Sequence, residues 1–295
     1  TNGTLMARWR GQQAVLSPSV SARAAGGLHA WTMDDTPSLL PRLHLFEFTD
    51  QTWVPDALRD LVTDYLHTIS TRLGIFDAAT EILARGLNAA QGPELVDLGS
   101  GGRGPLPRLR QLLAEKHGID ARVVLTDKFP NAQAAERARA EGVQYLERSV
   151  DALQVPAGLR GMRTLFNALH HFRPDEARAV LEDAQARGVP IAAFETVRRT
   201  PPAILSMLLV PLLVLLFTPM VKPLTPLRLL LTYVVPVAPL VIFWDGLVSA
   251  LRTHQPDELR RMTEALAREG YTWEVGEAKA PGKAAITYVL GRPTR

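Results

Sequence analysis

The 295-residue sequence contains no cysteine, which excludes disulfides, thiol nucleophiles and cysteine-ligated metals. It also has little net charge, with 33 basic and 30 acidic residues. Three of the arginines lie in the first 33 residues, which contain no acid, so the remainder is balanced at 30 residues of each sign. A balanced surface argues against a dedicated nucleic-acid interface, and no nucleic-acid partner is expected.

Residues 1–35 are rich in serine, alanine, glycine and arginine and contain no apolar core of the signal-peptide type. We predict a disordered tail here rather than a targeting segment. Met6 and Met33 are both possible start residues.

Residues 36–90 are predicted to form a helical N-terminal cap. Apolar residues at 58, 61, 62, 65, 66 and 69 recur at helical spacing, and Pro55 suits a first helical turn. The preceding stretch, residues 45–53, is dense in aromatic and acidic residues. It is either a packed entry to the helix or a lid over a ligand pocket. As a lid, it would bring Phe48 and Trp53 against the substrate.

From residue 94 onward, strand and helix patterns alternate. Strands are predicted at 95–98, 121–126, 143–146, 164–167 and 189–194, and helices at 106–115, 130–141 and 174–187. Such repeated units imply a mainly parallel sheet covered on both faces. A helix at 256–268 and strands at 271–277 and 284–290, joined by a Pro281-Gly282 turn, complete the pattern.

Residues 94–105 read ELVDLGSGGRGP, a short strand that runs into a glycine turn and then a helix. This layout presents backbone N–H groups to a nucleotide-like ligand. The glycines formally fit G-x-G-x-x-G, so an NAD(P)-dependent oxidoreductase is one alternative. Against it, the motif follows about ninety other residues, Asp97 interrupts an apolar strand end, and the chain closes with a two-strand hairpin.

The same features resemble the class I S-adenosylmethionine-dependent methyltransferases. Asp97, Gly99 and Gly101 match the first motif of that family, although Arg103 stands where its third glycine usually falls. Asp127 in LTDKF and Asp151 in SVDA match acids that follow the second and third strands. The resemblance implies an α/β, Rossmann-like seven-stranded sheet, mostly parallel with an antiparallel last strand. Its core would cover 91–200 and 246–295.

The resemblance also implies S-adenosyl-L-methionine as cofactor and a role for each acid. Asp97 would face the methionine end, Asp127 would accept hydrogen bonds from the ribose hydroxyls, and Asp151 would meet the adenine amino group. The residues expected at the cofactor are Asp97, Gly99, Ser100, Gly101, Gly102, Asp127, Lys128, Asp151, Ala152 and Asn167.

The fourth strand ends in FNALHHF, which resembles the family motif at the floor of the site. Methyl transfer proceeds by in-line displacement on an activated donor, and a base is needed only for a protonated nucleophile. His170 and His171 are the candidate bases, and a structural role for both remains open. Glu195, at the end of the fifth strand, is a candidate substrate contact. No second His/Asp cluster has ligand spacing, so no metal site is expected.

Residues 201–221 and 229–244 carry no charged side chain. Together they form an insert, 201–245. Its first arm, 201–221, approaches the length of a bilayer span, but Pro201, Pro202, Pro211 and Pro219 interrupt it. Three readings stay open: two transmembrane helices, a hairpin entering one leaflet with Lys222 and Arg228 at headgroups, or a buried hairpin or homo-oligomer contact. The leaflet hairpin is preferred. It predicts a cytoplasmic, membrane-associated enzyme with a small lipophilic acceptor, against the alternative of a non-catalytic membrane-associated scaffold.

Overall fold

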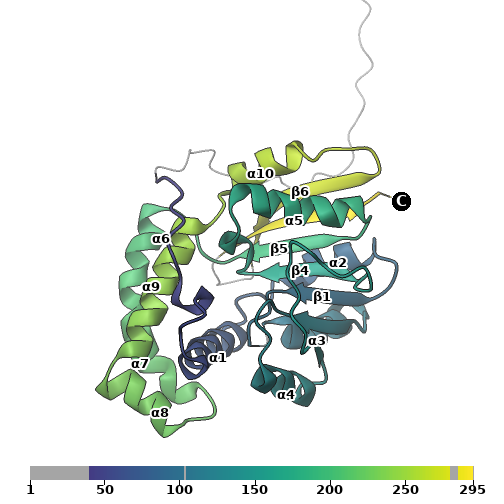
Figure 1. The fold of residues 1–295 in the computed structure, drawn as a ribbon. Helices are drawn as coiled ribbons and strands as arrows, with labels where there is room; N and C mark the ends of the chain where they lie inside the picture. The colour runs from purple at the N-terminus through teal and green to yellow at the C-terminus, as the bar shows by residue number, and fades with distance from the viewer. Residues whose placement is uncertain (1–39, 103, 280–284, 295) are drawn as a thin grey trace, which may run out of the picture. The chain divides into compact units, whose positions relative to one another are not determined.

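The computed structural model describes residues 40–102, 104–279 and 285–294. The predicted tail, Arg103 and the Pro281-Gly282 turn lie outside these residues. The described chain contains one seven-stranded sheet with the order β3-β2-β1-β4-β5-β7-β6 (Figure 1). Its strands are β1 (Glu94–Leu98), β2 (Arg122–Thr126), β3 (Gln144–Tyr145), β4 (Met162–Phe166), β5 (Ile191–Glu195), β6 (Tyr271–Ala278) and β7 (Ile286–Pro293). Strand β7 runs antiparallel to β5 and β6, and the other pairs are parallel. The predicted fold class is confirmed.

Neighbouring residues of β1 point into two separate cores, which explains why the apolar residues Leu95 and Val96 are consecutive. Leu95 packs in a cluster with Leu109 and Leu113, whereas Val96 packs in a second cluster with Val180 and Leu181. Helices therefore cover both faces, as the strand–helix alternation predicted. These helices are α2 (Ala79–Leu87), α3 (Leu106–His117), α4 (Ala132–Ala140), α5 (Pro174–Ala186) and α10 (Pro256–Glu264).

The insert and the cap pack against each other. The cap contributes the short helix η1 (Phe48–Asp50) and the long helix α1 (Asp56–Arg72). The insert comprises α6 (Pro201–Ser206), η3 (Met207–Leu209), α7 (Val210–Phe217), η4 (Thr218–Met220), α8 (Pro226–Leu229), η5 (Leu230–Val234) and α9 (Val237–Arg252). Helices α7 and α9 lie side by side, next to α1 (Figure 1). Val62 and Tyr65 of α1 form a small third core with Val214, Val241 and Ile242.

The outer surface of the insert remains strongly apolar. Pro201–Met220 is a 20-residue helical run, and its most apolar 18-residue window has a mean hydropathy of 2.4 and is 11% buried. The second arm bends by 74° between Val234 and Val237. Six of the insert's large apolar side chains are at least 60% exposed: Leu205, Leu208, Leu212, Leu216, Val234 and Leu240. Length and composition would let the first arm, and the bent second arm, cross a membrane.

One prediction for the insert is wrong, because Arg228 does not reach outward. Its side chain is buried, and Nη2 lies 2.6 Å from Oδ2 of the buried Asp64 on α1. Asp64 also pairs with Arg137 of α4. A buried carboxylate requires a cationic or hydrogen-bonding partner, and this requirement holds Arg228 inside the protein. Lys222 is exposed.

Candidate functional site

The glycine turn after β1 has a backbone that glycine adopts readily and other residues adopt only with strain. Gly99, Gly101 and Gly104 have φ angles of +75°, +56° and +58°. The backbone N–H groups of Gly99 and Ser100 both donate to the carbonyl of Thr126, at 3.0 and 2.9 Å. The turn is thereby tied to the carboxyl end of β2, next to Asp127.

Asp97 is the buried acid beneath this turn, with 1% of its surface exposed. Its Oδ1 accepts a hydrogen bond of 2.7 Å from the hydroxyl of Thr164 on β4. A Cβ on Gly104 would lie 3.2 Å from its Oδ2, so the turn closes tightly over the carboxylate. Burial raises the pKa of Asp97 to about 7, despite the hydrogen bonds from Thr164 and Ser100.

Asp127 and Asp151 lie on adjacent segments after β2 and β3. Asp127 accepts from the backbone N–H groups of Gly101 and Phe129, both at 2.8 Å. Burial raises the pKa of Asp127. The N–H of Val150 donates to the Asp127 carbonyl at 2.9 Å, which holds Asp151 close by. Asp151 pairs with Lys128 at 2.8 Å. Burial would raise the pKa of Asp151, but Lys128 and a backbone N–H donor outweigh it and lower this pKa.

Helix α1 covers the glycine turn, a contact that sequence reasoning missed. A Cβ on Gly102 would lie 3.4 Å from the Thr63 hydroxyl, and His67 Nδ1 lies 3.0 Å from the Gly104 carbonyl. From the sheet side, the Tyr145 hydroxyl donates to the Gly101 carbonyl at 3.3 Å. The cap therefore helps to shape this part of the site.

Asn167 and His170 join the ends of β4 and β5. Asn167 has a φ of +48°, which asparagine tolerates, and its Oδ1 accepts from the backbone N–H of Thr196 at 2.8 Å. His170, in η2 (Leu169–His171), is buried with 2% exposed. Its backbone N–H and Nδ1 contact the two Glu195 oxygens at 3.1 and 2.7 Å. Burial would raise the pKa of Glu195, but its contacts with His170 outweigh burial and lower this pKa.

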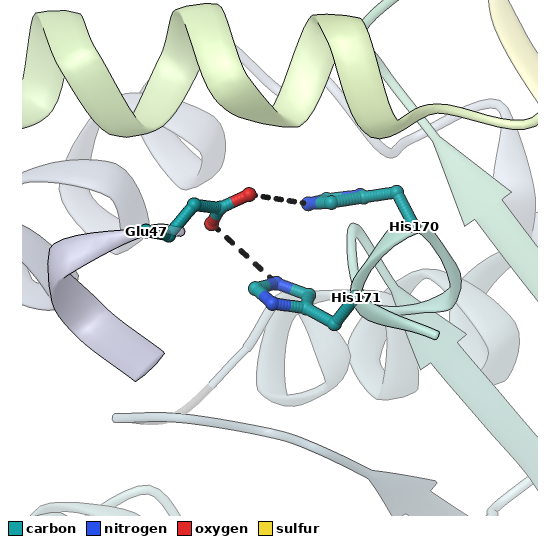
Figure 2. A group of neighbouring side chains, drawn as sticks. All are labelled: Glu47, His170 and His171. Atoms are coloured by element: carbon teal, nitrogen blue, oxygen red, sulfur yellow. Dashed lines mark ion pairs between the residues drawn. The ribbon is translucent and has the colours of Figure 1, made fainter. Parts of the chain in front are cut away.

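Glu47 from the cap completes a polar cluster with both histidines (Figure 2). Its Oε1 lies 3.7 Å from His170 Nε2, and its Oε2 lies 3.8 Å from His171 Nε2. Asp50 Oδ1 lies 2.9 Å from His171 Nδ1, off the hydrogen-bonding direction of that ring nitrogen. Burial would lower the pKa of His171, but Asp50 and Glu47 outweigh it and raise this pKa to about 9.

Helix α9 supplies the remaining charges of the cluster. Arg252 Nη1 lies 3.1 Å from Glu47 Oε1 and 2.7 Å from Asp50 Oδ2. Asp245 accepts from the backbone N–H of Phe48 at 2.7 Å and so anchors η1. Burial raises the pKa of Asp245, while that of Asp50 is strongly lowered because His171 and Arg252 outweigh its burial.

The predicted substrate contacts separate in the structure. Glu195 is buried against His170, and Phe48 packs against the core between α1 and the insert. Trp53 is 66% exposed and meets the edge of the Phe48 ring at a centroid distance of 6.0 Å. Sequence reasoning missed Glu47 and Arg252 as members of the cluster. The acids at 45–53 were the available signal for the first, and the return of charge at the end of the apolar insert was the signal for the second.

No protein-family model and no curated protein match the sequence. Among solved structures, the chain is similar to the plantazolicin methyltransferase BpumL in complex with SAH, with 10% identity and a TM-score of 0.49 over 81% of this chain and 96% of that one. It is also similar to mitomycin 7-O-methyltransferase MmcR, with 14% identity and a TM-score of 0.49 over 84% of this chain and 61% of that one. A third similar structure is magnesium protoporphyrin IX methyltransferase ChlM from Synechocystis PCC 6803 with bound SAM. Its sequence identity is 11% and its TM-score 0.45, over 84% of this chain and 99% of that one.

The fold is defined by the chain's own strand order. Strand β7 enters antiparallel between β5 and β6, at the end of an otherwise parallel sheet. This is the arrangement that the resemblance predicted. The chain has the Rossmann-like fold of the class I S-adenosylmethionine-dependent methyltransferases.

Proposed function

We propose that the protein transfers a methyl group from S-adenosylmethionine to a small lipophilic acceptor. The observation that carries this proposal is the grouping of Asp97, Asp127 and Asp151. Asp97 lies near the carboxyl end of β1, and Asp127 and Asp151 follow the neighbouring parallel strands β2 and β3, around one positive-φ glycine turn. Ligands of open α/β sheets bind at this carboxyl edge. A cofactor with an ammonium group, ribose hydroxyls and an adenine amine presents donors that suit carboxylates.

In this proposal the chain acts mainly by positioning. Asp127 holds the glycine turn through Gly101 and keeps unused lone pairs for ribose hydroxyls. The acceptor binds beside His170 and His171, between the cap and α9. Orienting the acceptor behind the methyl group can contribute about 7–11 kcal/mol. An acceptor that must lose a proton meets the histidine–Glu47 cluster. His171, with a pKa of about 9, is protonated at neutral pH and is a poor base there.

A lipid surface is the proposed neighbour of the apolar insert. Exposed leucines run along its first arm, from Leu205 to Leu216, and Val234 and Leu240 add to them from the second. Such a row of exposed side chains forms a larger apolar patch than the few hundred Å² that a soluble protein usually exposes in one place. The far end of α9 carries Asp245 and Arg252 into the polar cluster. An acceptor dissolved in the bilayer would therefore enter the site along the insert.

Vesicle cosedimentation tests the membrane contact. The full chain should sediment with phosphatidylcholine vesicles, and the double variant Leu212→Glu/Leu216→Glu should remain in the supernatant. Leu73→Glu is the matched control, because Leu73 is also exposed but lies at the end of α1. Equal sedimentation of all three proteins, or none with the wild type, would contradict this part of the proposal.

Methyl transfer is tested with S-adenosylmethionine labelled in the methyl group and an apolar cell extract presented in vesicles. Label should move into the organic phase with the wild type and not with Asp127→Ala. Label in neither organic nor aqueous products, across extracts from several sources, would count against an enzyme and favour the scaffold alternative.

A further inference from the structure

We infer that Glu47, His170 and His171 form a binding site for a divalent transition-metal ion. The three ligand atoms lie within 4.8 Å of one another. The Nε2 atoms of the two histidines face different oxygens of the same carboxylate, at 3.7 and 3.8 Å (Figure 2). Two ligands held about 2.1 Å from a tetrahedral ion are about 3.4 Å apart, so small side-chain shifts suffice for coordination.

The groups behind the histidines match those of metal sites. A ligating histidine typically gives its other ring nitrogen to a carboxylate, which fixes the tautomer and the ring. Here Glu195 is hydrogen-bonded to Nδ1 of His170 at 2.7 Å, whereas Asp50 lies 2.9 Å from Nδ1 of His171 and the ring must turn to form that bond. The two Nε2 atoms are thus left facing Glu47.

The Nε2 atom of His170 is an unsatisfied polar atom within the part of the chain that the structure describes. It is buried and has no hydrogen-bond partner among the described residues. An unsatisfied buried polar atom costs about 1–3 kcal/mol. Coordination of a metal ion would satisfy this atom.

The carboxylates around the trio also favour a cation. A divalent ion would displace the proton of His171, because only a neutral imidazole can ligate a metal. The carboxylates of Glu47, Asp50 and Glu195 and the guanidinium of Arg252 then leave a formal charge of −2, which the ion offsets. Arg252 shares Oε1 of Glu47 at 3.1 Å, so Oε2, on the His171 side, is the freer oxygen.

The donor set indicates the class of metal. Two imidazoles and one carboxylate suit Zn²⁺ or Fe²⁺, whereas Mg²⁺ and Ca²⁺ prefer oxygen ligands throughout. Three protein ligands leave at least one position for another molecule, as in catalytic zinc sites. If the proposed methyl transfer holds, an oxygen of the acceptor would occupy that position.

The test uses the full chain, stripped with EDTA and titrated with Zn²⁺ by calorimetry and with Co²⁺ by visible absorption. One equivalent should bind, with Co²⁺ d–d bands. Glu47→Gln and His171→Gln should each weaken binding at least tenfold and alter the bands. His117→Gln, distant on α3, should change neither result. His171→Gln should disturb folding less than Glu47→Gln, because the His171 side chain is 30% exposed and that of Glu47 is 3% exposed.

S-adenosylhomocysteine binding by the same variants separates this site from the proposed function. The metal inference predicts unchanged cofactor binding in Glu47→Gln. Wild-type protein that binds the cofactor but no Zn²⁺ or Co²⁺ would overturn the metal site. Equal metal binding by the wild type and both cluster variants would also overturn it. Wild-type protein that binds Zn²⁺ or Co²⁺ but not S-adenosylhomocysteine would count against the methyltransferase and leave the metal site in place.

Discussion

The two halves of the sheet's carboxyl edge are built differently. The acids at the carboxyl ends of β1, β2 and β3 come from one run of chain, residues 97–151. Asp127 and Asp151 bond to neighbours within it, and Asp97 also accepts a hydrogen bond from Thr164 of β4. The cluster after β4 and β5 is assembled from four separate segments that contribute Glu47, His170, Glu195 and Arg252. The first half depends on local sequence, whereas the second depends on how the cap and α9 pack.

Their electrostatics also differ. Asp97 and Asp127 are bonded to hydroxyl and backbone donors, and among the described residues neither makes an ion pair, so burial raises both pKa values. Asp50 and Glu195 contact histidines, Asp50 also contacts Arg252, and the pKa values of both acids are lowered despite burial. The first half is therefore suited to a ligand that brings positive charge or donors of its own. In the second half, the acids already contact side-chain partners within the protein.

The largest effect is expected where the insert, which includes α9, is anchored to the cap. Asp64→Ala would leave Arg228 buried without its ion-pair partner, and should lower the free energy of unfolding by about 3–5 kcal/mol. Urea denaturation measures this loss. Asp56→Ala, at an exposed acid of the same helix, should cost less than about 1 kcal/mol. Similar losses for the two variants would refute the anchoring role of Asp64.

Asp127→Ala should damage the first half almost as strongly. It removes the proposed ribose acceptor and frees the Gly101 N–H, and hydrogen bonds to charged groups contribute about 1.5–3 kcal/mol each. S-adenosylhomocysteine should bind at least about 100-fold more weakly by calorimetry. Asp127→Asn should lose less, because it keeps one acceptor oxygen. Asp120→Ala, an exposed acid before β2, should bind normally. Unchanged binding in Asp127→Ala would remove Asp127 from the site.

The pH dependence of stability tests the burial of Asp97. Its pKa is raised from an ordinary value near 4 to about 7, so the folded protein holds this proton more tightly than the unfolded chain. The resulting stabilisation is full below pH 4 and is lost as the pH rises through 7, with a slope of at most about 1.4 kcal/mol per pH unit. Asp97→Asn should flatten the curve between pH 4 and 7. A slope identical to that of the wild type would contradict the shifted pKa.

Trp53→Ala should have the smallest effect on folding, and it distinguishes the two readings of residues 45–53. Because Trp53 is largely exposed, the free energy of unfolding should change by less than about 0.5 kcal/mol. If the segment is a lid, the KM for the acceptor should rise several-fold with S-adenosylhomocysteine binding unchanged. An unchanged KM would favour a packed entry to the helix.

Much of the fold could be predicted from the sequence because its signals are local. Apolar runs ending at Leu98 and just before Asp127 marked β1 and β2, and Gly118 and Gly188 marked the ends of α3 and α5. The resemblance then supplied the sheet order, which the structure confirms.

The polar cluster and the Arg228 pair could not be predicted in the same way. Glu47 and His170 are more than a hundred residues apart, as are Asp64 and Arg228. Only the packing of α1 and α9 brings each pair together. A periodic pattern reports which face of a helix is apolar, but not which buried acid a distant arginine will meet.

Ligand discrimination by calorimetry tests the central claim most directly. The purified full chain, titrated separately with S-adenosylhomocysteine and with NAD, should bind about one equivalent of the first and none of the second. Tight binding of NAD without binding of S-adenosylhomocysteine would contradict the account and favour the oxidoreductase alternative.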